Sequence, residues 1–399
     1  MSFAYSDESI EIREIASGEV KTIAKVPTAP VATVDLHPQN THLIVTHQHH
    51  AIEWDLQTGR LANRYSTTLS RQYLQSGNSV TDVNYSNDGK RVMVTGYYGG
   101  SRLWEQLAEE PDIFLKYKIE GSRAAQFAAN DTRVVSCDDN LLTIWDLGTQ
   151  EKHKEFDSRK LRGTGYWSKI NDVAVSPKGN YAIATSNGSG GGDVTIGALI
   201  RLDLEPAGAG VVATNKTGFN VLEFAPSSEF FCTGSFDKKL AVRNSLTCAV
   251  QRTYPCSSKL TAAGISPASD IIVSGEQKGG MTVWRRGANA PVAMLRQHQK
   301  RVNKIKFSSD GRRMISCSED GKTIVWDTVT WQELATMVVS NDGNDWLVYT
   351  PDGRFDGTEG GKKLLSIQNA DSGKYLSQDE IRENYFYSGL LAIVWAGSN

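Results

Sequence analysis

The sequence predicts an all-β protein built as a ring of similar four-stranded sheets. An apolar strand that ends in an aliphatic or aromatic residue recurs at intervals of 41 to 49 residues. A unit of this size cannot bury its own apolar faces, so it must stack on neighbouring units. The eight strand ends are Leu36, Tyr85, Phe127, Val175, Phe224, Ile265, Phe307 and Tyr349.

A second column of strand ends supports the same ring. Six of them follow the first column by 18 or 19 residues, and one follows it by 27 residues. The long interval contains the run SNGSGGGD, Ser186 to Asp193, which we expect to lengthen one hairpin. Elsewhere, Asp-Gly and Lys-Gly turns separate short runs of β-branched and aromatic residues. The second column consists of Trp54, Trp104, Trp145, Leu202, Arg243, Trp284 and Trp326.

Three residues of this column, Trp54, Trp145 and Trp326, are each followed by Asp. One such pair is a weak signal, but seven strand ends at matching distances are a strong one. The chain therefore resembles the WD-repeat (WD40) β-propeller family over nearly all of residues 9 to 357. The resemblance implies a β-propeller, a fold that usually binds other molecules rather than catalysing reactions.

The resemblance also implies a buried polar network. In the family, a His before the first strand and an Asp in the second hairpin turn join the Trp of the third strand. His298, Asp320 and Trp326 occupy these positions in one repeat, and Asp139 and Asp237 match the Asp in two others. Most repeats lack the His, so we expect the network to support only part of the ring.

The two ends of the chain determine the expected number of blades. Ser9 to Val26 matches the latter half of a repeat, and the segment from Asn344 matches the first half. Sharing one blade between the ends would remove two exposed sheet edges. We expect a propeller over residues 1–360 with eight blades, closed by pairing N- and C-terminal strands. Seven blades is the alternative, if the segment after Asn344 is an external strand pair.

Composition narrows the class of protein. The 43 basic and 45 acidic residues give a formal net charge of −2, and no basic run of nucleic-acid-binding length is present. The first residues lack a basic leader, and no apolar stretch approaches the roughly 20 residues of a membrane-spanning helix. We therefore expect a cytoplasmic protein without specific nucleic-acid binding or membrane insertion. The five cysteines are expected to be reduced structural thiols.

Three motifs contain residue types that bind metals or phosphate, but each has a simpler interpretation. The HQHH segment falls in an expected hairpin turn, the glycine run in a hairpin insertion, and the carboxylate cluster in turns. No serine, histidine and aspartate set with a nucleophile elbow is present. We expect no metal, no cofactor and no catalytic residues. The three motifs comprise His47, His49 and His50; Gly190, Gly191, Gly192 and Asp193; and Asp352, Asp356 and Glu359.

Candidate binding residues are the large aromatic and basic side chains of loops expected on one face. Aromatic and Arg side chains dominate the energetics of protein interfaces. The loops of about Ser66 to Ser79 and Asp157 to Lys169 are longer than blade closure requires, which favours a functional role. The candidates are Arg71, Tyr73, Tyr97, Tyr98, Tyr166, Trp167, Phe236, Lys300 and Arg301.

The tail, residues 361–399, breaks the repeat. Ser377 and Glu380 form a capping box, and the apolar positions that follow suggest short helices that pack on the propeller or on a partner. Residues 344–360 and the end of the tail resemble the segment that closes the propeller in a bacterial group of WD-repeat proteins. Some of those proteins continue into a caspase-like peptidase domain. The resemblance implies a propeller that acts on a separate effector, such as a peptidase.

Together these observations predict a non-enzymatic scaffold or adaptor that organises a multiprotein complex through one loop face. The alternative is a propeller enzyme or small-ligand sensor that uses the central channel. Aromatic and Arg residues on the rim would favour the first, whereas His and carboxylate groups converging on the channel would favour the second.

Overall fold

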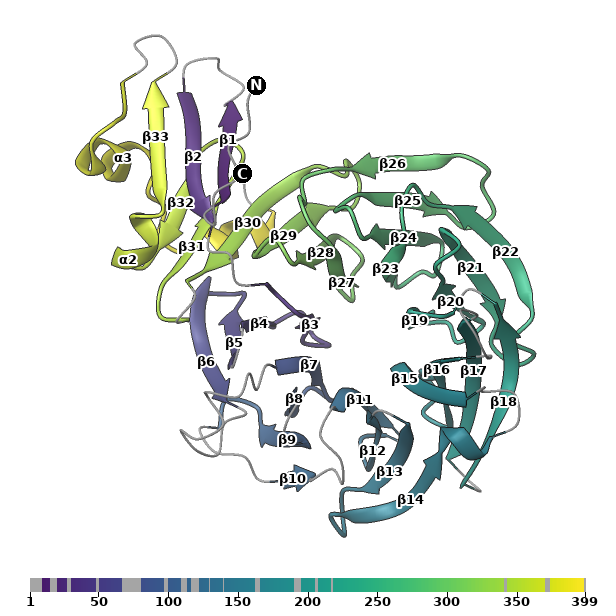
Figure 1. Ribbon diagram of the computed structural model, residues 1–399. Coiled ribbons are helices and arrows are strands. Elements are labelled where there is room, and N and C mark those ends of the chain that lie inside the picture. The colour runs from purple at the N-terminus through teal and green to yellow at the C-terminus, as the bar shows by residue number, and fades with distance from the viewer. Residues whose placement is uncertain are drawn as a thin grey trace.

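Seven antiparallel sheets stand around a common centre in the computed structural model (Figure 1). Six sheets have four strands each and the seventh has six. The structure describes residues 9–14, 20–26, 30–47, 50–66, 80–96, 100–108, 113–115, 122–128, 130–138, 140–161, 166–189, 195–204, 207–216, 218–340, 343–369 and 374–397.

The first four blades, A to D, follow one another along the chain. Blade A contains β3 (Val34–Leu36), β4 (His42–His47), β5 (His50–Asp55) and β6 (Arg60–Ser66). Blade B contains β7 (Val80–Tyr85), β8 (Arg91–Gly96), β9 (Gly100–Glu105) and β10 (Ile113–Leu115). Blade C contains β11 (Ser122–Ala128), β12 (Arg133–Asp138), β13 (Leu141–Asp146) and β14 (Glu151–Asp157). Blade D contains β15 (Tyr166–Val175), β16 (Tyr181–Ser189), β17 (Thr195–Leu204) and β18 (Ala207–Asn215).

The last three blades, E to G, complete the ring. Blade E contains β19 (Val221–Phe224), β20 (Phe230–Gly234), β21 (Lys239–Asn244) and β22 (Val250–Pro255). Blade F contains β23 (Leu260–Ile265), β24 (Ile271–Glu276), β25 (Met281–Arg285) and β26 (Pro291–Leu295). Blade G contains β27 (Val302–Phe307), β28 (Arg313–Ser318), β29 (Lys322–Asp327) and β30 (Glu333–Val339), and β31 (Trp346–Tyr349) and β32 (Phe355–Gly357) extend it.

The residues of both columns of the sequence pattern lie on the strands where the repeat predicts them. The first seven strand ends lie on the innermost strands, and every residue of the second column lies on the third strand of its blade. All seven side chains of the second column are buried, with at most 9% exposed. The insertion before Leu202 lengthens the hairpin of β16 and β17, although Gly190, Gly191, Gly192 and Asp193 lie outside the described residues. The periodic pattern therefore predicted the interior of the blades correctly.

The expected eight blades are wrong, and the seven-bladed alternative is confirmed. Blades A and G each take four strands from one continuous segment, so no strand is missing for the chain ends to supply. The strands after Asn344 instead form an external pair: β31 pairs with β30, and β32 pairs with β31. The N-terminal strands β1 (Ser9–Glu14) and β2 (Val20–Val26) do pair with a C-terminal strand, β33 (Leu365–Asn369). That three-stranded sheet lies outside the ring (Figure 1).

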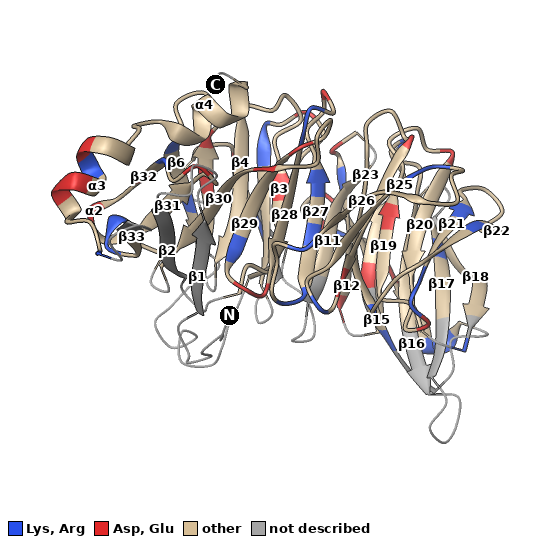
Figure 2. Cartoon of the chain, turned by 90° about the horizontal axis from the view of Figure 1, so that it is seen from above, with Lys and Arg blue, Asp and Glu red and all other residues tan. Residues whose placement is uncertain are grey.

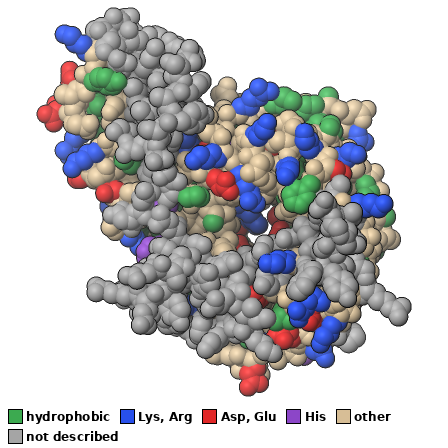
Figure 3. All heavy atoms as spheres, viewed as in Figure 1, with side chains coloured by type: hydrophobic (Ala, Val, Ile, Leu, Met, Phe, Trp, Pro, Cys, Tyr) green, Lys and Arg blue, Asp and Glu red, His purple; other side chains and the backbone are tan. Residues whose placement is uncertain are grey.

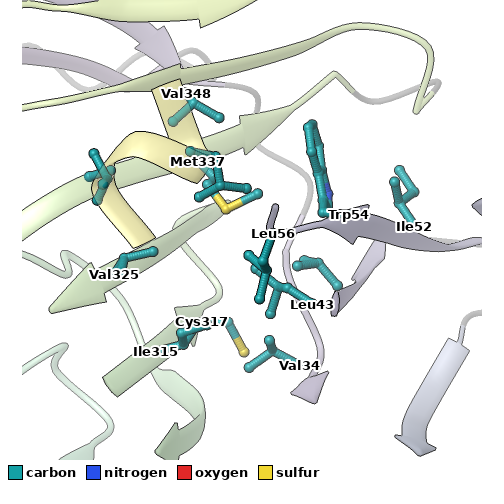
Figure 4. Close-up of a cluster of buried hydrophobic side chains, with 14 of the residues drawn as sticks. Val34, Leu43, Ile52, Trp54, Leu56, Ile315, Cys317, Val325, Met337 and Val348 are labelled. Carbon is teal, nitrogen blue, oxygen red and sulfur yellow. The ribbon is translucent and has the colours of Figure 1, made fainter. Parts of the chain in front are cut away.

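The seam between blades A and G closes the ring without exchanging a strand. The backbone N–H of Val31 donates to the carbonyl of Ser318 at 3.1 Å, and the Asn303 side chain donates to the carbonyl of Val31 at 2.8 Å. Figure 4 shows apolar side chains of both blades meeting there, including Val34, Leu43, Ile315 and Cys317. Burial of this apolar cluster supplies the main stabilisation of the seam.

Three short helices follow β32: α2 (Glu359–Lys362), at the boundary of the tail, and α3 (Gln378–Tyr385) and α4 (Leu390–Ala396) within it. The expected capping box at Ser377 and Glu380 is present, and Ile381 of α3 packs in a cluster with β31, β32 and β33. Leu390, Leu391 and Val394 of α4 join the seam cluster. In the described part of the chain, none of the helices has the length and apolarity needed to cross a lipid bilayer.

Candidate protein-binding face and central channel

The strand ends define two faces of the ring. Because neighbouring strands are antiparallel, the turns between second and third strands and the connections between blades all lie on one face, called here the loop face. The turns between first and second strands and between third and fourth strands lie on the opposite face. Figure 2 shows the ring from its edge, with α4 on that opposite face.

The nine sequence-predicted binding residues are described to different extents. Arg71, Tyr73, Tyr97 and Tyr98 lie outside the described residues. Tyr166 and Trp167 begin β15 at its loop-face end, but the structure does not describe their side chains. Phe236, Lys300 and Arg301 are described, and all three lie in loop-face turns or connections.

Phe236 is the exposed aromatic residue of this group. Its side chain lies in the turn between β20 and β21 with 43% of its surface exposed. The ammonium group of Lys259, in the connection from blade E to blade F, is 4.9 Å from the centre of the ring. A cation over an aromatic face is an attractive arrangement, so this pair forms a defined feature of the loop face.

The connection that carries Lys300 and Arg301 is held by a buried network. His298 Nδ1 lies 3.0 Å from the Asp320 carboxylate, and His298 Nε2 lies 2.8 Å from Ser316 Oγ. Trp326 Nε1 donates to the same Ser316 oxygen at 2.9 Å. Burial alone would raise the pKa of Asp320, but the His298 side chain holds it at about 2. The network implied by the family resemblance is therefore present at these residues.

The other matches to this network differ. Asp139 lies outside the described residues. Asp237 is exposed and accepts hydrogen bonds from Ser235 Oγ and from the backbone N–H of Lys239, so it shapes its own turn. At the Trp position of that blade, Arg243 donates to Thr233 Oγ1 at 3.0 Å and to the carbonyl of Cys248 at 2.9 Å.

Charged side chains of several blades meet at the central channel. Lys306 of β27 lies 3.5 Å from Asp35 of β3 and 3.9 Å from Glu223 of β19. Because blades E and A are not neighbours, side chains of their inner strands can share one lysine only across the centre of the ring. Figure 3 shows acidic and basic side chains in the hollow at this centre. Lys304, also of β27, lies 4.0 Å from Glu223.

Two further carboxylates of the inner strands interact with the same lysine, Lys304. Burial raises the pKa of Asp172, in β15, to about 7, although Lys304 partly opposes this effect. Burial likewise raises the pKa of Asp82, in β7, with the same lysine opposing it. The carboxylates Asp82, Asp172 and Glu223 in turn raise the pKa of Lys304, and they outweigh the opposite effect of its burial.

Sequence reasoning missed these channel residues, although the sequence contains a signal for them. Each lies one or three residues before the end of its inner strand. Positions that differ by two share one side of a strand, so all of them belong to the side that faces the centre. The set is Asp35, Asp82, Asp172, Glu223, Lys304 and Lys306.

A second group of titratable side chains lies between blades A and B, on the opposite face. Glu53 is fully buried and accepts hydrogen bonds from Tyr65 at 2.5 Å, Tyr85 at 2.7 Å and Gln106 at 3.1 Å. Burial and the Glu53 carboxylate raise the pKa values of both tyrosines. A polar cavity of about 360 Å³ adjoins this group and has His37 and His42 in its wall. These groups satisfy one another's hydrogen bonds, which makes the arrangement a polar joint between two blades.

The three motifs considered for metals or phosphate do not converge on a site. His47 and His50 face each other in the β4 and β5 hairpin, as expected of a turn, and His49 is outside the described residues. Asp352 pairs with Arg354, Asp356 accepts from the Gly389 N–H, and Glu359 pairs with Lys362. In the described ranges, no three His, Cys, Asp or Glu side chains are placed to hold a metal ion.

Comparison with known proteins supports the repeat assignment. Residues 289–327 match the family model "WD domain, G-beta repeat", and this segment contains the complete His298 network. The chain is 24% identical over 187 residues to Protein LST8 homolog of Drosophila melanogaster, a match covering 45% of this chain and 55% of that protein. One segment of the chain thus matches the WD-repeat model, and the chain is similar to WD-repeat proteins over part of its length.

Two further relatives match over shorter stretches. One is Guanine nucleotide-binding protein subunit beta-1 of Caenorhabditis briggsae, 32% identical over 73 residues, or 18% of this chain and 22% of that protein. The other is Eukaryotic translation initiation factor 3 subunit I of Taeniopygia guttata, 28% identical over 84 residues, or 21% of this chain and 26% of that protein. The chain therefore spans between 22% and 55% of the length of these three relatives.

Proposed function

We propose that the protein is a non-catalytic scaffold or adaptor of the WD-repeat class, which organises a multiprotein complex through its loop face. Two of the relatives are named as subunits of larger proteins, which supports a role within an assembly. A rigid seven-bladed ring also suits this role, because it presents many loops on one surface without requiring any of them to move.

The observation that carries the proposal is the exposed Phe236 with Lys259 against its ring, on the same face as Lys300 and Arg301. Exposed aromatic and Arg side chains are the usual anchors of protein interfaces. We propose that the six other predicted residues extend this surface around the ring. They are Arg71, Tyr73, Tyr97, Tyr98, Tyr166 and Trp167.

The finer parts of the proposal come from the family resemblance. They are a bacterial origin and a separate effector protein, such as a peptidase, as the partner, whereas the cytoplasmic location that we also propose comes from the composition of the chain. The near balance of 43 basic and 45 acidic residues supports a protein partner over nucleic acid.

Affinity purification from the native host, followed by mass spectrometry, tests this function. A stoichiometric protein partner should be lost from the variant Phe236→Ala with Arg301→Ala. It should be retained by the matched variant Leu246→Ala with Arg286→Ala, which removes an exposed apolar side chain and an Arg from the opposite face. Equal capture by both variants, or a bound metabolite in place of a protein, would contradict the proposal.

The aromatic pair at the start of β15 provides a second test. The variant Tyr166→Ala with Trp167→Ala should leave the melting temperature almost unchanged and weaken capture of the partner. A large loss of thermal stability would instead mean that the two rings pack inside the protein.

A small-ligand sensor that uses the channel is the second candidate. It is favoured by the four carboxylates and two lysines that converge there. Histidine, the other residue type that would favour it, lies in the blade A and B joint rather than on the described inner-strand positions of the channel. Native mass spectrometry of the purified protein separates the two candidates, because only a sensor should retain a small molecule.

A further inference from the structure

The loop face of blades E, F and G is rich in basic side chains. Figure 3 shows Lys and Arg gathering on this face over β23 to β29. Five of the side chains are exposed and Arg301 is half-buried. The group, called here the basic surface, comprises Lys238, Lys259, Lys278, Arg296, Lys300 and Arg301.

The basic surface is continuous across the three blades. Lys259 touches Phe236 of blade E, and its carbonyl accepts a hydrogen bond from the Gln277 N–H of blade F at 2.8 Å. Gly279, next to Lys278, packs closely on the backbone of His298 to Lys300. The carbonyl of Arg301 accepts from the Glu319 N–H of blade G at 2.9 Å. Each connection thus contacts the next turn along the ring.

The backbone beneath these side chains is held by buried carboxylates. Glu276 accepts hydrogen bonds from the backbone N–H groups of Ser257, at 3.2 Å, and Ser258, at 2.6 Å. Asp320 accepts from the Gln299 N–H at 2.9 Å, beside its contact with His298. The two connections between blades E, F and G therefore need no ordering when a ligand arrives, which lowers the entropic cost of binding.

Few acidic side chains balance the basic surface. Among the described loop-face turns and connections of these blades, Asp237, Glu319 and Asp345 are the acids that are not buried, and Asp345 accepts a hydrogen bond from Thr358 at the outer edge of blade G. Arg301 lies 3.7 Å from Glu319, and no ion pair joins the other five cations to a described residue. The surface therefore carries a local positive potential although the whole chain has a net charge of −2.

We infer that the basic surface binds a segment of a partner protein that is rich in Asp and Glu and carries an apolar side chain. This inference rests on the proposed function and specifies the chemistry of its partner. Carboxylates would pair with the exposed cations, and the apolar side chain would cover the exposed part of Phe236. Asp237 and Glu319 interrupt the positive charge, which suits discrete carboxylates better than the continuous phosphate backbone of a nucleic acid.

A binding assay with a defined probe tests the inference. The probe is a fluorescent oligoglutamate peptide with one central Leu, and the same peptide with Gln in place of Glu is its control. The full-length protein should bind the Glu peptide and not the Gln peptide, and binding should weaken as salt rises, because salt screens exposed charges. Equal binding of the two peptides would overturn the inference.

Two charge-reversal variants locate the site. Lys259→Glu with Lys300→Glu should weaken binding of the Glu peptide by about tenfold or more, since two contacts become repulsive. Arg285→Glu with Arg286→Glu changes the net charge equally on the opposite face and should weaken binding by less than about threefold. Equal weakening by both variants would mean that net charge alone attracts the peptide, and would overturn the assignment to this surface.

Phe236→Ala tests the apolar part of the inference. It should weaken binding of the Leu-containing peptide and leave unchanged the binding of a peptide with Ser in place of Leu. Circular dichroism of each variant checks that the fold is retained.

A nucleic-acid ligand is tested with single-stranded DNA. If the protein binds this DNA more tightly than the Glu peptide, and if Lys259→Glu with Lys300→Glu abolishes that binding, the surface is a nucleic-acid site and the inference is contradicted.

The same variants separate this inference from the proposed function. If Lys259→Glu with Lys300→Glu still captures the native partner while Phe236→Ala with Arg301→Ala loses it, the scaffold role stands and the acidic segment is wrong. If neither variant affects capture, the loop face itself is wrong.

Discussion

The two faces of blades E, F and G arrange their charges differently. On the opposite face, Arg285, Arg286 and Arg313 pair with Asp270, Glu229 and Asp327 at 3.5, 3.4 and 3.2 Å. On the loop face, one of the six cations of the basic surface has an acidic partner within 4 Å in the described structure. The same strands supply both faces, so the fold does not cause the difference.

The fold does not require the unpaired cations of the basic surface to find acidic partners. An exposed ion pair contributes only about 0 to 1 kcal/mol to stability, so leaving a surface lysine unpaired costs little. Its positive charge then stays available to a partner. The opposite face instead carries balanced charges and the helix α4 over the seam. The variants below test this division of roles.

The largest expected effect concerns the helix on the opposite face. Leu391→Ala in α4 should lower the free energy of unfolding by about 3 kcal/mol, because a fully buried side chain leaves a cavity in the seam. Urea denaturation measures the change, with the 85% exposed Val329→Ala of the same face as control. Glu-peptide binding on the loop face should be unchanged while the protein is folded. A decrease in the free energy of unfolding no larger than that of Val329→Ala would mean that α4 does not stabilise the seam.

The next effect concerns the network beneath the loop face. Asp320→Asn should lower the free energy of unfolding by about 2 kcal/mol at pH 7, because the pKa of Asp320 is about 2 in the folded protein and higher when unfolded. A carboxyl group whose pKa is lowered by folding stabilises the folded protein at pH values above its unfolded pKa. This stabilisation is lost as the pH falls toward 2. The difference in the free energy of unfolding between wild type and Asp320→Asn should therefore vanish in acid. Asp237→Asn, at an exposed turn, is the control, and a difference independent of pH would contradict the assignment.

A smaller effect of opposite sign is expected in the channel that joins the two faces. Burial raises the pKa of Asp172 to about 7 when folded, which alone would cost the folded protein about 4 kcal/mol at pH 8. Because Asp172 is only partly buried and its carboxylate attracts Lys304, we expect Asp172→Asn to raise the free energy of unfolding by only about 1 kcal/mol at pH 8. The folded protein then holds a proton that the unfolded chain releases, so stability falls between about pH 4 and pH 7. The Asp172→Asn variant has no carboxyl group to titrate at this position, so its stability does not fall in this pH range. Denaturation at pH 5 and pH 8 checks it, and an equal gain at both pH values would exclude the titration of Asp172 as its cause.

The smallest effects compare single cations of the two faces. Arg286→Ala should lower the free energy of unfolding by about 0.5 kcal/mol, since it removes one exposed ion pair. Lys300→Ala should change stability by less than this, because no ion pair of Lys300 is described. Thermal denaturation of the two variants in low salt gives the comparison. A larger loss for Lys300→Ala would show that the basic surface contributes to folding.

The interior of the blades could be predicted from the sequence because its signals are local. Strand ends such as Phe224 and Trp326 recur at fixed intervals, and turn residues separate them. The blade count could not be predicted in the same way. The segment ending at Tyr349 has the pattern of a strand, and that pattern does not distinguish an innermost strand from one added at the outer edge of blade G.

The candidate site was predicted less completely. Phe236, Lys300 and Arg301 were found because each is a large side chain in an expected loop. The channel pair of Lys306 and Glu223 depends on inner strands of different blades, and no local pattern gives their distance. The absence of acidic partners around the basic surface is also a property of the assembled face.

The external sheet has a consequence for the opening of the ring. Strand β2, next in the chain to blade A, is joined to β33, which follows blade G, by an antiparallel ladder from Val20 with Asn369 to Ala24 with Leu365. If the two terminal blades separate in a fluctuation, this ladder keeps them tethered at a high effective concentration. Reclosure is then an intramolecular step over a short span, so transient opening need not lead to unfolding or to exchange of blades between molecules.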